Sequence, residues 1–527
     1  MRTTPSIHRG AVALVGALFW TSVACAQQSD QLEAAGSTNM TATEAVATIT
    51  SEDMYARIAT IAADSMRGRD TPSPELDETA RWLADQYAAF GLEPAGEDGT
   101  YLQRYPFPLR ALDTAGVHFG TVKDGEDVML EHGTDFFVSA ATPFEDRAMG
   151  HGALVWVSRL EDGSWPSPEA ARGQVMVVSL PGTYDRDWRI ASGRARRSAQ
   201  AAGARGLVVV LGPDFSELAF ERLAELAGTP RRSLVDPAEI PVFHLRPAAA
   251  AAVLARGGVD LEALAATPET SVAVPGVEAH FSADAVVVEE ASAPNVVAML
   301  RGSDPDLADT YVVFSAHMDH VGVGTANAAG DSIYNGADDD ASGTSALVEM
   351  AEAFSRLATP PRRSVVFLNV SGEEKGLLGS RWFSEHPTLP VDRIVANVNM
   401  DMIGRNAPDS IVVIGMDYSS LGPLVQRVAA EHPDLGLTVS DDLWPEERFF
   451  FRSDHFNFAR LEIPALFFFA GVHEDYHQPS DEVAKLDVDK AARVARLAFW
   501  TAHAIADSPE PPRWTEPGIE EVRALTR

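Results

Sequence analysis

The chain of 527 residues is longer than one typical domain, which favours two domains. Its 76 acidic side chains outnumber its 42 lysines and arginines, and the resulting formal charge of −34 argues against binding to nucleic acid or to anionic lipid surfaces. An apolar content of 46% is typical of a folded protein with a core of ordinary size.

The first residues have the pattern of an export signal. Arg2 and Arg9 form a basic start, residues 11–20 are apolar but too few to cross a bilayer, and Ala-Cys-Ala at 24–26 fits a cleavage site. We therefore expect a signal peptide over residues 1–26, no membrane-spanning segment in the rest of the chain, and a periplasmic or secreted protein. The alternative is cleavage before Cys25, the single cysteine, which would leave a lipid anchor there.

Residues 27–48 are rich in Ser, Thr, Ala and Gln, and this composition predicts a flexible leader. Beyond it, apolar residues at helical spacing predict one helix from residue 51 and another over residues 74–90. We assign residues 49–134 to the N-terminal part of the catalytic domain.

Residues 135–278 form a region rich in Ala, Gly and Val, with strands predicted at 173–178, 207–210 and 240–243. The order of these landmarks resembles the protease-associated domain, a lid-like module inserted in several exopeptidase families. The resemblance implies an inserted α/β domain. The alternative is a plain α/β insertion without a role of its own, and no catalytic set is visible here.

Residues 279–510 alternate strands with helices, which predicts an α/β fold with a mostly parallel (mixed) sheet flanked by helices on both faces. In such sheets the sites lie at the carboxyl ends of the strands. Residues 511–527 are left as a C-terminal tail. The expected strands are 296–300, 311–315, 365–370, 394–399, 411–414 and 465–469, and the expected helices are 345–357, 377–385, 421–432 and 488–506.

Five groups of His, Asp and Glu follow these expected strands. Each group alone has a plain interpretation as a surface pair, a solvated loop or a helix start. Together they supply nitrogen and oxygen ligands of the kind that zinc prefers, and five ligands exceed the three that one catalytic zinc needs. Two metal ions that share a bridging carboxylate would use all five. The groups are His317 with Asp319, the Asp338-Asp339-Asp340 triplet between glycines, Glu373-Glu374, Asp401, and Tyr476-His477.

These motifs occur in the order found in a known family. The chain resembles the di-zinc exopeptidases that include the bacterial leucyl aminopeptidases and glutamate carboxypeptidase II, and the likeness covers roughly residues 50–505. The family often carries a protease-associated domain at the position of the insertion. The resemblance implies peptide substrates and two zinc ions per chain.

The resemblance assigns a role to each matching residue. His317 and Asp401 would bind one zinc, Glu374 and His477 would bind the other, and Asp339 would bridge them. Glu373 is not a ligand in this pattern. It would act as the general base, taking a proton from the attacking water and passing it to the leaving amine.

Further residues receive supporting roles from the same resemblance. Asp319 would orient His317, Tyr476 would donate a hydrogen bond to the developing oxyanion, and a cis peptide bond would follow Asp339. Asp481 has two interpretations, either support of His477 or capping of a turn. The remaining members, Asp338, Asp340, His320 and His473, are taken as loop or supporting residues and not as ligands.

The segment Phe-Arg-Ser-Asp-His at 451–455 would border the substrate pocket in the family. Arg452 would then read a substrate carboxylate and Asp454 a free amino terminus, whereas helix capping by Ser453 or Asp454 is the alternative. We expect an aminopeptidase acting on short peptides. The alternatives are a carboxypeptidase of the same mechanism, a single-zinc glutaminyl cyclase, and a receptor-like protein with the fold but without catalysis.

Overall fold

The structure is a computed structural model that describes residues 39–138, 149–160, 163, 165–234, 240–267 and 271–526. The expected signal peptide, Cys25 and most of the expected leader lie outside these residues. None of the helices in the described part of the chain is both long and apolar enough to cross a membrane.

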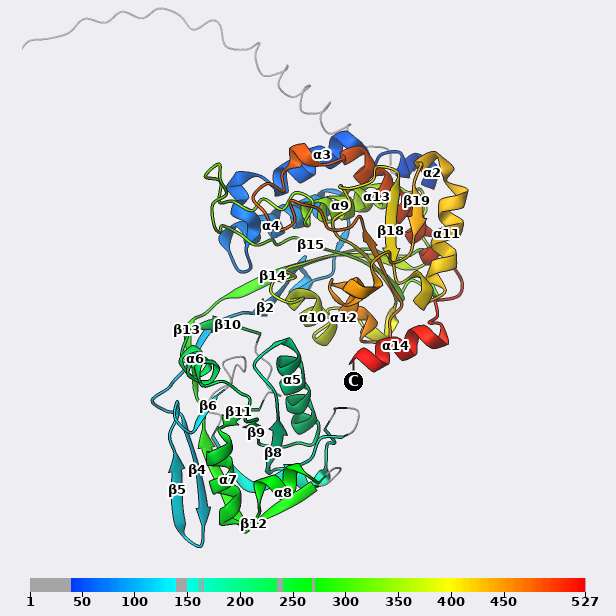
Figure 1. The fold of residues 1–527 in the computed structure, drawn as a ribbon. Helices are drawn as coiled ribbons and strands as arrows, with labels where there is room; N and C mark the ends of the chain where they lie inside the picture. Colours follow the sequence, from blue (N-terminus) through cyan, green and yellow to red (C-terminus); the bar gives the residue numbers. More distant parts are fainter. Residues whose placement is uncertain are drawn as a thin grey trace, which may run out of the picture.

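The larger domain is built on a nine-stranded mixed sheet, which confirms the predicted fold class (Figure 1). Its four central strands run parallel, while the strand that flanks them on each side runs antiparallel to the central strand beside it. The strand order is β1 (Glu93–Pro94), β14 (Ser292–Leu300), β16 (Ser364–Val370), β15 (Tyr311–His317), β17 (Ile394–Met400), β20 (Ala465–Phe469), β18 (Ser410–Ile414) and β19 (Thr438–Ser440), with β2 (Leu102–Pro106) paired to β14.

Helices cover both faces of this sheet because its central strands are apolar on both faces. Val312 and Phe314 of β15 face one helical layer, whereas Tyr311 and Val313 face the other. The first layer contains α3 (Ser51–Ile61), α4 (Pro74–Ala89), α9 (Ala341–Ser355), α11 (Leu421–Glu431) and α13 (Val488–Asp507), and the second contains α10 (Leu378–Glu385) and α12 (His455–Ala459).

Both ends of the described chain are more ordered than the sequence suggested. The prediction of a flexible leader up to residue 48 is wrong for its described part, because α2 (Ala42–Val46) begins at a capping box on Thr41 and buries Ala45 and Val46. In the expected tail, α14 (Glu516–Thr526) docks on the main domain through buried Val522 and an ion pair of 2.7 Å between Arg523 and Glu462.

The inserted domain has an eight-stranded sheet of its own, with helices on both sides. The predicted boundaries at 134/135 and 278 are wrong, because two strands before residue 134 belong to this sheet and residue 278 falls within a strand. The strand order is β5 (Glu126–Leu130), β4 (His118–Lys123), β12 (Ser271–Ser282), β7 (Met149–Val157), β8 (Val175–Leu180), β9 (Gly206–Leu211), β11 (Val242–Leu245) and β6 (Phe136–Val138). The helices are α5 (Arg186–Ala201), α6 (Glu217–Ala227), α7 (Pro247–Arg256) and α8 (Leu261–Ala265).

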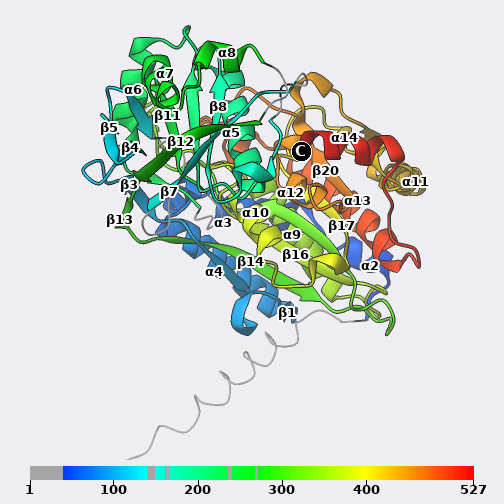
Figure 2. The same ribbon diagram turned by 90° about the horizontal axis from the view of Figure 1, so that it is seen from below.

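The insertion leaves and rejoins the main sheet at one edge (Figure 2). Pro106 at the end of β2 pairs with Ser292 at the start of β14, and β14 runs antiparallel to β16, so both crossing points lie level with the carboxyl end of β16. A small sheet of β3 (Leu109–Leu112), β10 (Arg231–Arg232) and β13 (Ala285–Glu289) joins the two domains.

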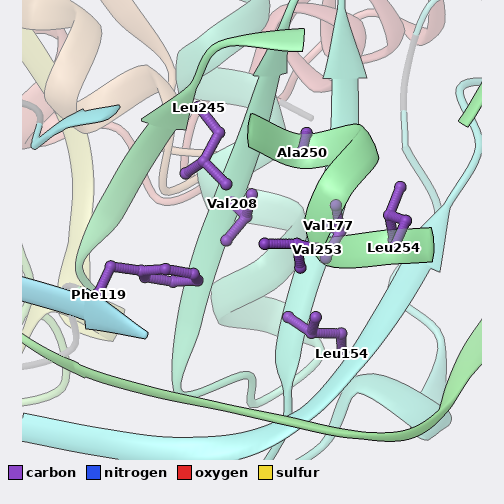
Figure 3. Close-up of a pocket in the computed structure, with 8 residues that line it drawn as sticks. All are labelled: Phe119, Leu154, Val177, Val208, Leu245, Ala250, Val253 and Leu254. Carbon is purple, nitrogen blue, oxygen red and sulfur yellow. The ribbon is translucent and has the colours of Figure 1, made fainter. Parts of the chain in front are cut away.

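The core of the inserted domain contains a small cavity between the sheet and α7 (Figure 3). Leu154, Val177 and Val208 of the strands face Val253 and Leu254 of the helix across it. Because its lining is entirely apolar, the cavity offers no hydrogen-bond partner to water or to a polar ligand. We therefore attribute it to imperfect core packing.

Candidate metal centre

Four parallel strands bring the predicted ligands to one edge of the sheet. His317 is the last residue of β15, and Asp401 follows β17 directly. Glu374 lies four residues after β16, and His477 lies in the loop after β20. Two groups of potential metal ligands result, one with His317, Asp340 and Asp401 and the other with His320, Asp339, Glu374 and His477.

Asp339 stands between the two histidines and presents one oxygen to each. Its Oδ1 lies 3.1 Å from His317 Nε2, and its Oδ2 lies 3.1 Å from His477 Nε2. On the first side Asp401 Oδ1 is 3.6 Å from His317 Nε2, and on the second Glu374 Oε2 is 3.0 Å from His477 Nε2. The arrangement is that of a carboxylate shared by two ligand sets.

The loop that carries Asp339 is held in place by hydrogen bonds to its backbone N–H groups. Asp481 accepts hydrogen bonds from the backbone N–H groups of Asp338 (3.1 Å) and Asp339 (3.2 Å). It therefore anchors this loop, a role that differs from both interpretations drawn from the sequence, support of His477 and capping of a turn. The Asp339–Asp340 peptide bond is cis, as the resemblance implied. Gly336 has φ 57°, and a Cβ there would lie 2.2 Å from the carbonyl oxygen of Asp339, so the glycine lets the loop close.

Asp340 belongs to the scaffold, although its position would permit metal binding. Its Oδ1 accepts the N–H of Gly343 (2.8 Å) and caps α9, and its Oδ2 accepts the N–H of His317 (3.1 Å). Both oxygens therefore already have backbone donors. Asp401 differs, because only its Oδ2 is hydrogen-bonded, to the Ser453 hydroxyl at 2.8 Å. Its Oδ1 remains available on the side of His317.

The group of Asp319 that orients the His317 ring is its backbone carbonyl, whereas the prediction was its carboxylate. The nearest acceptor for its Nδ1 is the backbone carbonyl of Asp319 at 3.1 Å, while the Asp319 carboxylate lies 3.7 Å away. That carboxylate instead accepts hydrogen bonds from the Thr71 hydroxyl (2.9 Å) and from the backbone N–H of Glu373 (3.3 Å). Asp319 thus connects His317 to the loop of the proposed base.

Glu373 and Tyr476 lie beside the cluster but outside both ligand groups. Burial and the nearby carboxylates of Asp454, Glu374 and Asp401 raise the pKa of Glu373 well above its ordinary value. Burial and the same acidic surroundings also raise the pKa of Tyr476, whose ring stacks on that of His477 at 3.9 Å. The tyrosine hydroxyl therefore keeps its proton and can donate a hydrogen bond.

The segment 451–455 serves the site in a way that sequence reasoning did not anticipate. Ser453 hydrogen-bonds Asp401 and does not cap α12, and neither does Asp454. Asp454 is fully buried, accepts a 2.6 Å hydrogen bond from Ser380, and has a pKa that burial raises to about 7. Arg452 is exposed and lies over the ring of Phe449.

Two residues of the site were missed from the sequence. His320, which was taken as a supporting residue, is fully buried with its Nδ1 2.8 Å from Glu374 Oε1. Arg69 is also fully buried and donates to the backbone carbonyls of Met318, Asn335 and Gly336. The second histidine of His-Met-Asp-His was a usable signal for His320, whereas Arg69 lies in no motif.

The chemistry of the cluster fits a metal ion. The facing atoms are buried and approach one another without hydrogen-bond geometry, as atoms do when they converge on a common point. Such buried polar atoms are costly unless an ion satisfies them. The atoms concerned are Asp339 Oδ2, Glu374 Oε1, Asp401 Oδ1, His320 Nδ1 and His477 Nε2.

Comparison with known proteins agrees with this chemistry. Residues 295–502 match the model of peptidase family M28, which confirms the family resemblance seen in the motifs. A probable zinc metalloprotease of Pyrenophora tritici-repentis is 26% identical over 261 residues, which cover 42% of this chain and 53% of the relative. Leupeptin-inactivating enzyme 1 of Streptomyces exfoliatus is 25% identical over 242 residues, 41% of this chain and 50% of that protein. The chain thus spans about half the length of these curated relatives.

Two solved structures with a similar chain path are aminopeptidases by title. The zinc aminopeptidase from Bacillus subtilis matches with a TM-score of 0.46 and 18% identity, over 88% of this chain and 97% of that one. The aminopeptidase from Aneurinibacillus sp. strain AM-1 matches with a TM-score of 0.45 and 19% identity, over 90% and 97% of the two chains.

Proposed function

We propose that the protein is a zinc-dependent aminopeptidase that releases the N-terminal residue of peptides, since residues 295–502 match the model of peptidase family M28. The observation that carries the proposal is the position of Asp339, with one carboxylate oxygen toward His317 and the other toward His477. This supports two zinc ions per chain, with Asp401 completing one ligand set and Glu374 the other. His320 is close enough to Glu374 to orient it or to join that set.

Zinc bound at these residues would polarise the scissile carbonyl and lower the pKa of an attacking water. Glu373, kept out of both ligand sets, accepts the proton of that water and returns it to the leaving amine as the peptide bond breaks. Burial raises the pKa of Glu373, which favours its uptake of the proton from that water. The Tyr476 hydroxyl donates a hydrogen bond to the carbonyl oxygen as it gains negative charge.

The direct test measures metal content and hydrolysis on one preparation. We expect two zinc ions per chain, cleavage of leucine anilide, and no cleavage of its N-acetylated form. Glu373→Gln should keep both zinc ions and lose at least about 10²-fold in kcat, which is the usual contribution of a general base. Tyr476→Phe should lose about 10²-fold in kcat with little change in KM.

Other outcomes would replace the proposal with a named alternative. Cleavage of N-blocked but not C-blocked peptides would indicate a carboxypeptidase. One zinc per chain with cyclisation of N-terminal glutamine would indicate a glutaminyl cyclase. Zinc-free protein without activity would indicate a receptor-like role, and normal turnover by zinc-loaded Glu373→Gln would refute the mechanism.

We further propose that the protein is exported and that residues 107–291 form a protease-associated domain. The export proposal is supported by the basic and apolar pattern of residues 1–26. Mass spectrometry of the mature N-terminus separates the two routes. A start at Gln27 supports a soluble periplasmic or secreted protein, whereas a lipid-modified Cys25 supports an anchored one.

A further inference from the structure

A row of buried polar side chains leads across the main sheet to the metal centre. In the neighbouring parallel strands β15 and β17, Val313 stands opposite Asn397, and Ser315 stands opposite Asn399. Because alternate residues of a strand share a face, these side chains all lie on the face that α10 and α12 cover. Ser315, Asn397 and Asn399 are fully buried. Polar groups at such positions are costly unless they find hydrogen-bond partners.

The partners of these side chains are one another. The Asn397 amide donates to the Ser315 hydroxyl (3.0 Å), which in turn donates to the carbonyl oxygen of the Asn399 side chain (2.6 Å). The Asn399 amide donates to the hydroxyl of Ser453, just before α12 (2.9 Å), and that hydroxyl donates to Asp401 Oδ2 (2.8 Å). We call Asn397, Ser315, Asn399 and Ser453 the polar row. Its hydrogen bonds all run in one direction and end on a proposed zinc ligand.

The direction of these hydrogen bonds follows from which groups can donate. The distance of 2.6 Å between Ser315 Oγ and Asn399 Oδ1 is typical of an O–H···O bond, and the distance of 2.9 Å between Asn399 Nδ2 and Ser453 Oγ is typical of an N–H···O bond. A serine hydroxyl has a single proton to donate. Because Ser453 Oγ accepts the N–H of Asn399, the proton of Ser453 is directed to Asp401.

The result is a carboxylate with one oxygen committed and the other free. Asp401 Oδ2 accepts the Ser453 hydroxyl, whereas Asp401 Oδ1 is buried without a hydrogen-bond partner and lies 3.6 Å from His317 Nε2. Groups that hydrogen-bond a ligating carboxylate hold it in its binding orientation. If the Ser453 hydroxyl turned away, Asp401 would be free to rotate and the ligand pair would be less well prepared for an ion.

We propose that Asn399 is a positioning residue for the zinc site of His317 and Asp401, and that it acts through Ser453. Ser315 supports this role by fixing the orientation of the Asn399 amide. The inference rests on the proposed zinc peptidase function and explains why an asparagine lies two residues before the ligand Asp401. The other ligand set is not held by Asp401, so the effect is confined to one of the two zinc ions.

The test is a double-mutant cycle in which both zinc affinities are measured by competition with a chelator. The proteins are the wild type, Asn399→Leu, Ser453→Ala and the double variant. We expect Asn399→Leu to weaken one zinc affinity about fivefold, as for the loss of one neutral hydrogen bond, and to leave the other affinity unchanged. In the Ser453→Ala background the same substitution should have no further effect, because residues that act through one another are not additive.

Two further variants separate this role from a general effect on folding. Ser315→Ala removes little volume and should weaken the same zinc affinity about twofold, again only when Ser453 is present, because hydrogen bonds in a row strengthen one another. Asn295→Leu is the matched control, because Asn295 is equally buried in β14 but its amide donates to Gln103 and Gly379 and not to a proposed ligand. It should lower the free energy of unfolding and leave both zinc affinities unchanged.

An equal loss for Asn399→Leu with and without Ser453 would overturn the inference, since the effect would then not pass through Ser453. Tighter zinc binding by Asn399→Leu would also overturn it, because the amide would then have been drawing the Ser453 proton away from Asp401. If the wild type binds two zinc ions and cleaves leucine anilide but shows no coupling in the cycle, only the role of the polar row is refuted. A wild type without zinc or activity refutes the proposed function, and this inference with it.

Discussion

Asp481 offers a sharp test of how the metal centre is held, because it contacts the loop of Asp339 without belonging to either ligand group. Its buried carboxylate accepts N–H groups from Asp338 and Asp339. In Asp481→Asn the size is kept but the charge is lost. A hydrogen bond to a charged acceptor contributes about 1 kcal/mol more than a neutral one, so two bonds lose about 2 kcal/mol. We therefore expect zinc affinity to fall about 30-fold, since 1.36 kcal/mol corresponds to a factor of ten.

Zinc affinity is measured by competition with a chelator on the folded protein, with circular dichroism as a check on folding. Asp487→Asn is the matched control, because Asp487 caps α13 through the N–H of Lys490 and contacts no ligand. It should leave both the unfolding free energy and the zinc affinity nearly unchanged, because Asn caps a helix about as well as Asp does. Equal zinc affinity in Asp481→Asn and wild type would refute the argument that this carboxylate positions Asp339.

Three further changes test neighbouring contacts. Ser453→Ala removes the hydrogen bond to Asp401, so we expect about tenfold weaker zinc binding at one of the two sites. A zinc titration should then show two unequal affinities, and equal affinities would contradict this prediction. Thr71→Val removes the hydroxyl that donates a hydrogen bond to Asp319, so kcat should fall about tenfold while KM stays nearly constant. A change in KM alone would argue against a role of this contact in catalysis. Burial raises the pKa of Asp475, but hydrogen bonds from its basic and hydroxyl neighbours outweigh burial and lower that pKa. Asp475 therefore stabilises the fold above about pH 4 and loses this effect as the pH falls, so the difference in unfolding free energy between wild type and Asp475→Asn should shrink in acid; a constant difference from pH 7 to pH 3 would contradict it.

The sequence was most informative where the local pattern and the burial agree. The helix that begins at residue 51 and the strand that begins at residue 311 were predicted at their observed starts, because apolar residues recur at helical spacing in the first and form a continuous buried run in the second. Because the carboxyl ends of parallel strands share one edge of a sheet, the positions of His317, Asp401 and His477 after their strands were enough to predict that they lie together. The roles assigned to these residues remain predictions until metal binding is measured.

The sequence was least informative where contacts join distant segments. Strand β4 looks like any short strand, and only its partner β12, more than 140 residues later, assigns it to the inserted domain. Arg69 resembles a surface arginine until the carbonyls around it are known. For Asp319, spacing placed the side chain near His317, but the direction of its carboxylate depends on Thr71, which lies nearly 250 residues earlier.

The pairing of Pro106 with Ser292 has a consequence for how such a protein is assembled. Residues 107–291 depart and return at adjacent points of two neighbouring strands, so the main sheet is continuous without them. A tight turn of a few residues would close the gap between β2 and β14. The inserted domain is therefore a module that recombination or engineering can exchange as a unit, without altering the residues that form the metal centre.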